Sequence, residues 1–170
     1  PEKASLISQI LTLIGRVLGL IKESTIPKNS PQNAPESTII PKPDNIASPR
    51  ISKIMDWALA IQRQEGFFPG SKSQRNNNPG NLKFTTYTKS LGATKADPGN
   101  FCIFPTYEAG FSALFQFLRD ACTDKLKSYK GDMTLQAFTK IYALPPDNGY
   151  ATRVAQGLGV TILTKIKELL

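Results

Sequence analysis

Histidine is absent from the sequence of 170 residues. Its absence excludes the commonest zinc ligand, the serine and cysteine triads that depend on an imidazole, and every histidine general base. Chemistry in this chain must therefore use carboxylates, hydroxyls, lysine or tyrosine. The sequence implies no metal ion and no organic cofactor.

Cysteine is scarce as well, since the chain has only Cys102 and Cys122. Two cysteines so far apart are too few for a zinc knuckle or a disulfide framework. A single disulfide and two separate, semi-buried hydrophobic side chains both fit the sequence. We favour the second interpretation, because an unpaired cysteine usually behaves as a small hydrophobic residue.

Acidic side chains are outnumbered: 13 Asp and Glu stand against 21 Lys and Arg, which gives a net charge of +8. Such a balance suits nucleic acid, an anionic membrane face or a bacterial cell wall, because long-range attraction does not specify the partner. An ordinary basic surface explains it too. The positive charges are dispersed and lack interleaved aromatic residues, so we predict no specific nucleic-acid partner.

Residues 1–23 are predicted to form a separate amphipathic helix, because polar residues recur at helical spacing in the run SLISQILTLIGRVLGLIKE. Gly15 and Gly19 form a Gly-x-x-x-Gly pair, which lets another helix approach closely. Arg16, inside the apolar run, disfavours a simple membrane span. We expect this helix to dock on a larger assembly, to oligomerise or to contact a membrane; packing on the chain's own core is a further alternative.

Residues 24–49 contain six prolines among polar residues and are predicted to be an extended, semi-rigid linker. Residues 50–170 are predicted to form one mostly helical α+β domain with a small β-hairpin. Gly66 is a natural helix stop, and Thr106 and Thr134 are expected N-caps. The expected helices cover residues 51–65, 106–126, 134–142, 150–158 and 161–170, and the expected strands cover residues 82–87 and 100–104.

Glu65 is the candidate acid. It lies in the last turn of the first expected domain helix, directly before Gly66. A negative charge there meets the negative end of the helix dipole, and the following Phe67 and Phe68 could desolvate it. Both effects favour a protonated carboxyl that can donate a proton near neutral pH. An exposed glutamate at a helix end explains the same pattern without function.

A polar loop with the run RNNNPGN follows the glutamate. Its amides and the nearby hydroxyls both donate and accept hydrogen bonds, which suits the hydroxyl and acetamido groups of a sugar. Turn formation is the alternative, because Asn-Pro-Gly-Asn is a strong turn by itself. We predict that Asn77 and Asn81 face a ligand, and that Pro79 and Gly80 serve the geometry of the loop.

Four segments in this order carry a resemblance to a known family: a helix ending in Glu-Gly, then RNNNPGNL, FPTYEAGFSALFQFL and IYALPPDNGYATRVAQGLGV. They resemble the lysozyme-like domains of phage virion-associated lysins and of soluble lytic transglycosylase-type proteins. The resemblance covers about residues 51–160. It implies a two-lobed fold in which a glycan lies in the cleft between a helical lobe and the hairpin.

The resemblance also implies roles for single residues. Glu65 takes the place of the general acid that protonates the glycosidic oxygen between the sugars of peptidoglycan. Tyr142 and Tyr150 take the places of aromatic residues that line such clefts. A buried tyrosine with its hydroxyl bonded explains each of them as well.

A second carboxylate would separate two mechanisms, because hydrolysis needs a base or nucleophile opposite the acid. Asp97, in the run KADPGN, is the only obvious candidate, and an Asp-Pro-Gly turn explains it without catalysis. Without such a partner, one glutamate acts first as acid and then as base and leaves a 1,6-anhydro sugar. A single-acid site therefore favours a lytic transglycosylase over a muramidase.

The sequence thus predicts an enzyme that cuts the β-1,4 glycan strands of peptidoglycan. Its expected partners are peptidoglycan itself and, through residues 1–23, a larger assembly or a membrane. The expected location is extracytoplasmic or on a phage virion, although no secretory signal pattern is evident. The alternative is a non-catalytic structural or glycan-binding module of a virion or envelope assembly.

Overall fold

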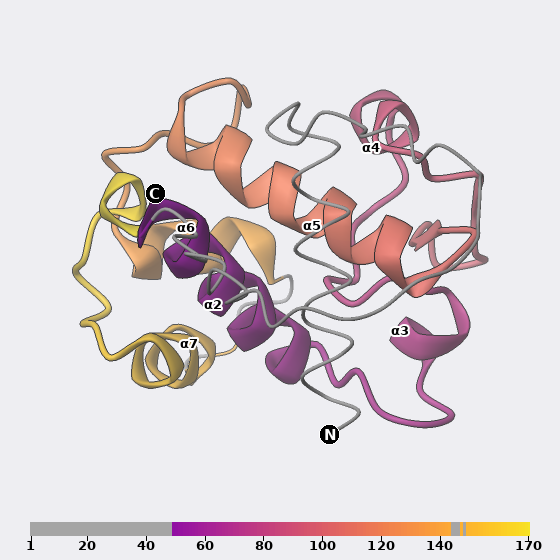
Figure 1. The fold of residues 1–170 in the computed structure, drawn as a ribbon, viewed down its shortest axis with the longest axis horizontal. Coiled ribbons are helices and arrows are strands. Elements are labelled where there is room, and N and C mark those ends of the chain that lie inside the picture. Colours follow the sequence, from indigo (N-terminus) through magenta and orange to yellow (C-terminus); the bar gives the residue numbers. More distant parts are fainter. Residues whose placement is uncertain (1–48, 144–146, 148) are drawn as a thin grey trace, which may run out of the picture. The chain divides into compact units, whose positions relative to one another are not determined.

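The computed structural model describes residues 49–143, 147 and 149–170 (Figure 1). The predicted helix over residues 1–23, and all but the last residue of the predicted linker over residues 24–49, lie outside the described residues. The described residues belong to one compact unit of the chain.

This unit is mostly helical with one small antiparallel sheet, as the sequence predicts for an α+β domain. No helix in the described part of the chain is both long and apolar enough to cross a membrane. The elements in chain order are α2 (Pro49–Gln64), α3 (Lys72–Arg75), α4 (Thr86–Ser90), β1 (Lys95–Ala96), β2 (Cys102–Ile103), α5 (Tyr107–Cys122), α6 (Leu135–Tyr142), α7 (Tyr150–Leu158) and the 3₁₀ helix η1 (Ile166–Leu169).

The core is built around α2, which packs against α5 and α7 and lies between them in Figure 1. Fully buried side chains come from all three helices, among them Ile61 of α2, Leu114 of α5 and Val154 of α7. Burial of each such aliphatic side chain contributes about 1.5–3 kcal/mol. The ends of α2 and α7 are also joined directly, because Arg153 Nε donates to Gln64 Oε1 at 2.6 Å.

A stack of aromatic rings runs outward from this core. Trp57, the one tryptophan of the sequence, is fully buried and meets Phe138 edge-on, with ring centroids 4.8 Å apart. Phe138 in turn stacks on Tyr142 at 5.3 Å. Offset and edge-on contacts of this kind stabilise a core beyond the area that they bury. The ring of Tyr142 is therefore supported by Phe138.

The expected helix boundaries are confirmed where a side chain caps the helix. Thr106 Oγ1 accepts from Ala109 N at the start of α5, and Thr134 Oγ1 accepts from Ala137 N at the start of α6, both at 3.2 Å. Gly66 has a φ of +67°, a left-handed conformation that favours glycine and ends the helical turn. Capping residues therefore gave the starts of these helices correctly, whereas α5 ends at Cys122 and not at the predicted residue 126.

The predicted first strand over residues 82–87 is wrong. Within it only Lys83 forms an isolated bridge, to Phe101, while β1 and β2 pair farther along the chain. The chain turns into α4 instead, because Thr85 and Thr88 form a reciprocal capping box. That box fixes a helix start inside the segment that was predicted to be a strand.

The predicted C-terminal helix over residues 161–170 is also wrong, since only η1 is helical there. The main-chain carbonyls of Ile162 and Thr164 accept from the amides of Gln136 and Leu135 at 2.9 and 2.8 Å. These amides belong to the first turn of α6, where no intrahelical acceptor exists. The C-terminal segment thus supplies hydrogen-bond acceptors to the first amides of α6 instead of forming a helix of its own.

Cys102 and Cys122 are both buried and free, which confirms the preferred interpretation over a disulfide. Burial raises the pKa of the Cys122 thiol to about 12, and its Sγ donates to the carbonyl of Ile166 at 3.0 Å. The pKa of Cys102 is raised too, chiefly by burial. Both thiols are therefore protonated at neutral pH and act as packing groups.

Candidate active site

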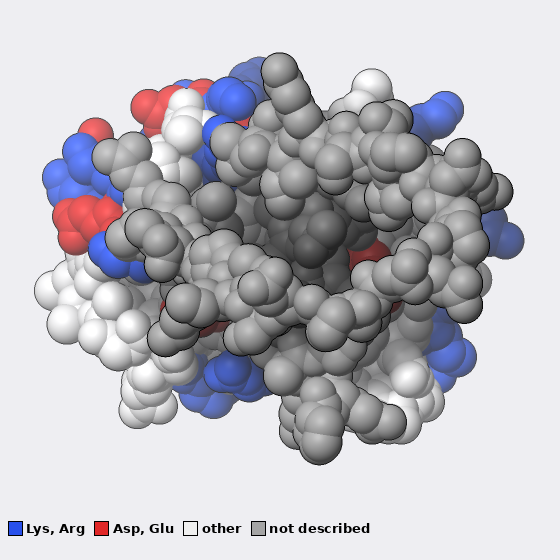
Figure 2. Space-filling view, viewed as in Figure 1, with Lys and Arg blue, Asp and Glu red and all other residues white. Residues whose placement is uncertain are grey.

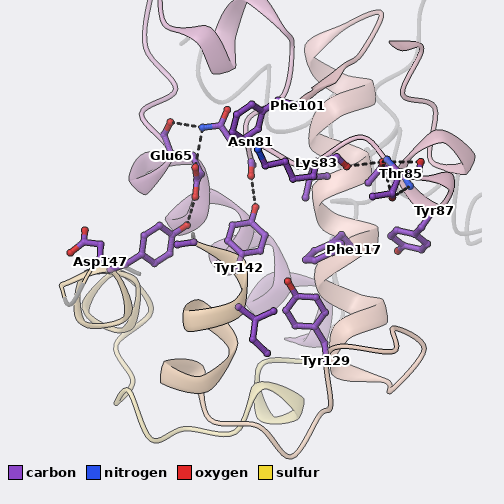
Figure 3. Close-up of a pocket in the computed structure, with 16 residues that line it drawn as sticks. Glu65, Asn81, Lys83, Thr85, Tyr87, Phe101, Phe117, Tyr129, Tyr142 and Asp147 are labelled. Atoms are coloured by element: carbon purple, nitrogen blue, oxygen red, sulfur yellow. Dashed lines mark hydrogen bonds between the residues drawn. The ribbon is translucent and has the colours of Figure 1, made fainter. Parts of the chain in front are cut away.

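Glu65 follows the last residue of α2, and its amide still donates to Ile61 O at 2.9 Å. The glutamate is therefore fixed by the helix, while Gly66 turns the chain away after it. Figure 3 shows its carboxylate directed into a cavity. The end of a well-packed helix is a rigid support for a reactive group.

Both oxygens of the Glu65 carboxylate accept hydrogen bonds (Figure 3). Tyr150, the first residue of α7, donates its hydroxyl to Oε1 at 2.7 Å. Asn81 donates Nδ2 to Oε2 at 2.9 Å and also to the main-chain oxygen of Glu65 at 3.2 Å. Two elements far apart in the sequence thus hold the carboxylate in one orientation.

Tyr150 can act only as a neutral hydroxyl at ordinary pH. Burial is the main cause that raises its pKa above the usual value, and the nearby carboxylate of Glu65 adds to the effect. A phenol in such a place keeps its proton. Tyr150 is therefore available as a hydrogen-bond donor to Glu65 over the whole neutral range.

The amide of Asn81 is oriented by its two contacts with Glu65, because only Nδ2 can donate to both glutamate oxygens. Its Oδ1 is left buried and, among the described residues, without a hydrogen-bond partner. An unpaired buried acceptor costs about 1–3 kcal/mol. The backbone of Asn81 is also in the left-handed region, with a φ of +45°. This residue is held in a costly state beside the glutamate, which is typical of functional sites.

Tyr142, at the end of α6, contacts the same loop. Its hydroxyl donates to Gly80 O at 2.5 Å, and burial raises its pKa well above the ordinary value. A Cβ at Gly80 would lie 2.7 Å from that hydroxyl and 2.7 Å from Leu114 Cδ1. These contacts agree with the predicted geometric role of Gly80, because a larger residue would force Leu114 or Tyr142 to move.

A cavity of about 410 Å³ extends from Glu65 between α6, α7 and the segment that contains α4. A space of this size suits a small ligand or part of a polymer. Four predicted site residues line it, namely Glu65, Asn81, Tyr142 and Tyr150. The remaining lining residues are Gly80, Leu82, Lys83, Thr85, Tyr87, Thr88, Phe101, Phe117, Tyr129, Ile141, Ala143 and Asp147.

Asn77, which the sequence also places at a ligand, does not belong to the lining of this cavity. Its Nδ2 donates to the main-chain oxygens of Phe104 and Pro105 at 3.1 and 3.3 Å. Its own carbonyl lies so close to Gly110 that a Cβ there would clash. Asn77 therefore ties the polar loop to the start of α5.

The other asparagines of the run are bonded within the protein as well. Asn78 is fully buried, accepts from Leu82 N and donates to the carbonyls of Leu82 and Cys102. Asn76 donates to Asp97 Oδ2 at 2.8 Å. Loop geometry accounts for most of this run, and Asn81 is the asparagine that reaches the cavity.

Asp97, the expected second carboxylate, is also outside the lining of the cavity. Its Oδ1 accepts from the amides of Gly99 and Phe101 at 2.8 Å each. The bond from Phe101 is the main cause that holds the pKa of Asp97 below its usual value. The structure thus places Asp97 in the turn that joins β1 to β2.

Asp147 is a lining carboxylate that sequence reasoning missed. Its Oδ1 accepts from Gly149 N at 2.8 Å, and its Oδ2 is paired with Arg153. These two contacts lower the pKa of Asp147, with the Gly149 bond as the larger cause. No local pattern could have revealed it, because an Asp two positions before a glycine is ordinary turn chemistry.

The charged side chains visible on one face of the domain are dispersed. On the face shown in Figure 2, the visible Lys and Arg side chains lie in separate groups around the margin, one of them mixed with Asp and Glu. Part of the positive charge is paired, since Lys165 and Lys167 both contact Asp132, at 3.1 and 2.7 Å. Within the described residues, no group of three or more Cys, Asp or Glu side chains is arranged to hold a metal ion.

Comparison with known proteins adds no relative: no protein-family model, no curated protein and no solved structure matches this chain.

Proposed function

We propose that the domain cleaves the β-1,4 glycan strands of peptidoglycan, with Glu65 as general acid and base. The observation that carries this proposal is the placement of Glu65 at a helix end, with its carboxylate in the wall of the cavity and held by Tyr150 and Asn81. The lysozyme-like resemblance of the sequence supplies the substrate class. The aromatic and amide lining is of the kind that binds sugars.

The proposed reaction needs only this one acid. Protonated Glu65 gives its proton to the glycosidic oxygen, and the bond between that oxygen and the anomeric carbon breaks. The resulting carboxylate takes the proton of the 6-hydroxyl of the same sugar, and the freed oxygen bonds to the anomeric carbon. The products are two shorter strands, one of which ends in a 1,6-anhydro sugar. No water is consumed, and Glu65 is protonated again.

The surroundings of the glutamate suit both steps. A hydroxyl can donate or accept, so Tyr150 keeps a hydrogen bond to Glu65 in either protonation state. Asn81 Nδ2 can only donate, so it favours the carboxylate that acts as base. Tyr150 and Asn81 are therefore positioning residues in this proposal.

A transglycosylase is favoured over a hydrolase by the state of the other carboxylates. Glycosidases with two carboxylates hold them about 5–5.5 or 6.5–9.5 Å apart, on both sides of the scissile bond. Asp97 is bonded within its turn and does not line the cavity. Asp147 lines the cavity, but Gly149 and Arg153 already occupy its oxygens.

Mass spectrometry of the fragments released from purified peptidoglycan tests the proposal, with Glu65→Gln as the matched variant. We expect 1,6-anhydro ends from the wild type and no fragments from the variant. Reducing ends would identify a hydrolase and direct attention to Asp147. Peptidoglycan that both proteins leave intact would overturn the catalytic role of Glu65.

A second candidate, a glycan-binding module that does not cut, is favoured by one specific observation. Hydrogen bonds to both oxygens of Glu65 join α2, α7 and the polar loop, and a purely structural carboxylate would be bonded in the same way. In that case Glu65→Gln would change the thermal stability of the domain and leave the affinity for intact glycan as it was.

A further inference from the structure

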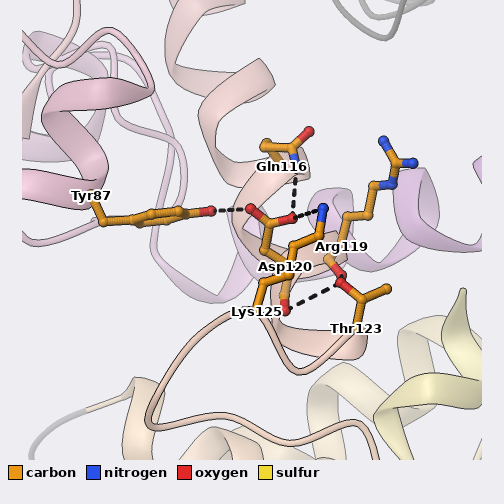
Figure 4. Close-up of polar contacts among 6 residues, drawn as sticks. All are labelled: Tyr87, Gln116, Arg119, Asp120, Thr123 and Lys125. Atoms are coloured by element: carbon orange, nitrogen blue, oxygen red, sulfur yellow. Dashed lines mark hydrogen bonds and ion pairs between the residues drawn. The ribbon is translucent and has the colours of Figure 1, made fainter.

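A second carboxylate network lies at the other end of the cavity and has no part in the proposed reaction. Asp120 of α5 is 7% exposed. Its Oδ2 accepts from the Tyr87 hydroxyl and its Oδ1 from Gln116 Nε2, both at 2.8 Å (Figure 4). Lys125 Nζ approaches Oδ1 at 3.4 Å.

A carboxylate that is buried in this way tends to lower the stability of the fold. Taking a charge out of water is unfavourable unless its partners compensate, and apolar residues of similar volume often serve stability as well or better. Asp120 itself does not line the cavity, whereas its partner Tyr87 does. The network thus acts on the cavity by holding one aromatic ring in its wall.

Tyr87 is the far member of a series of rings along the cavity. From Tyr150 beside Glu65, ring centroids follow at 6.5 Å to Tyr142, at 5.7 Å to Phe117 and at 6.3 Å to Tyr87. Figure 3 shows Glu65, Tyr142, Phe117 and Tyr87 in this order across the cavity. The hydroxyl of Tyr87 is bonded to Asp120, so its ring is anchored at one end.

We propose that the end of the cavity remote from Glu65 is a saccharide subsite, in which the Tyr87 ring, positioned by Asp120, contacts a sugar that is not adjacent to the scissile bond. The inference rests on the proposed function. Aromatic rings pack against the C–H faces of pyranoses, and Tyr87 and Phe117 both belong to the lining at this end. Tyr87 thereby sets how many sugars are bound on this side of the cleaved bond.

The test is steady-state kinetics on peptidoglycan oligosaccharides of increasing defined length. Tyr87→Ala is expected to raise KM roughly 2- to 10-fold for chains long enough to reach the subsite, with the effect absent on the shortest chains that are cut. Leu163→Ala removes an exposed apolar side chain outside the cavity and serves as the control. An equal rise of KM at every length, or no rise at any length, would overturn the subsite.

The role of Asp120 is tested on the same long chains. Tyr87→Phe and Asp120→Ala each remove the bond between the two residues, so we expect similar, smaller rises of KM that do not add in the double variant. Asp120→Asn should restore most of the affinity, because the Tyr87 hydroxyl can accept from the new amide. Additive effects, or an asparagine variant as weak as the alanine variant, would contradict the positioning role.

Two further measurements distinguish a variant that does not fold, a failure of the subsite and a failure of the proposed function. Thermal unfolding identifies any variant that does not fold; if Tyr87→Ala is one, the phenylalanine variant carries the test. Binding of intact long oligosaccharides is also compared between Glu65→Gln and Glu65→Gln combined with Tyr87→Phe. Weaker binding by the double variant would support the subsite even if the wild type cuts nothing, whereas equal binding would refute it even if cleavage is found.

Discussion

The two ends of the cavity repeat one chemical motif with different access. At one end the Tyr150 hydroxyl donates to Glu65 at 2.7 Å, and at the other end the Tyr87 hydroxyl donates to Asp120 at 2.8 Å. Glu65 lines the cavity and Asp120 lies behind its wall. The hydrogen bond from a tyrosine therefore does not distinguish these two carboxylates, whereas contact with the cavity does.

The two carboxylates also differ in the residues that donate to them. Asp120 is held by Tyr87, Gln116 and Lys125 and is nearly enclosed, which leaves no route for a substrate proton. Glu65 is held by two residues that also belong to the cavity lining. In the proposed function, the end with Glu65 exchanges a proton and the end with Asp120 fixes the ring of Tyr87.

The largest difference in activity between the two ends is expected when the charge of each carboxylate is removed. Glu65→Gln is expected to lower kcat by roughly 10²- to 10⁴-fold, because general acid–base catalysis contributes that much. Asp120→Asn should affect only the longer chains, and far less. Initial rates of fragment release measure both. Losses of comparable size would mean that Glu65 is no more catalytic than Asp120.

Removing the hydroxyl at each end sharpens the comparison. Tyr150→Phe takes one charge-assisted hydrogen bond from Glu65, and such bonds contribute about 1.5–3 kcal/mol. We therefore expect kcat to fall roughly 10- to 100-fold, while Tyr87→Phe raises KM for long chains only. Separate measurement of kcat and KM on short and long chains decides; a fall of kcat in both variants would speak against distinct roles.

The polar loop allows a third comparison, between Asn77 and Asn81. Asn77→Ala should lower the free energy of unfolding by about 1–3 kcal/mol and retain kcat, since its amide bonds only to main-chain oxygens. Asn81→Ala should lower kcat, because Glu65 loses its second donor. Chemical denaturation and fragment release are measured on both variants. A loss of kcat with Asn77→Ala would indicate that Asn77 takes part in the site.

The smallest effect is expected at Asp97, where hydrogen bonds lower the pKa of the carboxyl. A group whose pKa is lower in the folded state contributes stability above its unfolded pKa of about 3.9, and that contribution is lost as pH falls through the folded value. Asp97→Asn should therefore weaken this acid-dependent loss and leave activity at neutral pH intact. Thermal midpoints between pH 2 and 7, taken as about the titration range of an aspartate, provide the measurement. Loss of neutral-pH activity would instead support the second-carboxylate hypothesis.

Much of the fold could be predicted because its signals are local. The periodic helices and the caps at Thr106 and Thr134 depend on neighbouring residues, and Gly66 marks the end of the helix before the candidate acid. The two-residue strands are too short for alternation to be read. The C-terminal segment was misjudged because its carbonyls bond to the start of α6, which lies about thirty residues earlier.

The candidate site was predictable to a lesser degree. Glu65, Asn81, Tyr142 and Tyr150 line one cavity, whereas Asn77 and Asp97 are bonded elsewhere. Tyr87 and Asp120 are 33 positions apart, and nothing near either residue indicates the other. Such pairs are set by the packing of α4 on the rest of the domain, and only a structure reveals them.

The seclusion of Trp57 has a spectroscopic consequence. It is the one tryptophan of the sequence and is 0% exposed, two aromatic rings away from the cavity through Phe138 and Tyr142. Tryptophan emission of the whole chain therefore comes from a dry, enclosed environment and shifts to the red only when the domain core opens. The protein carries its own optical reporter of folding, and that reporter does not line the candidate cavity.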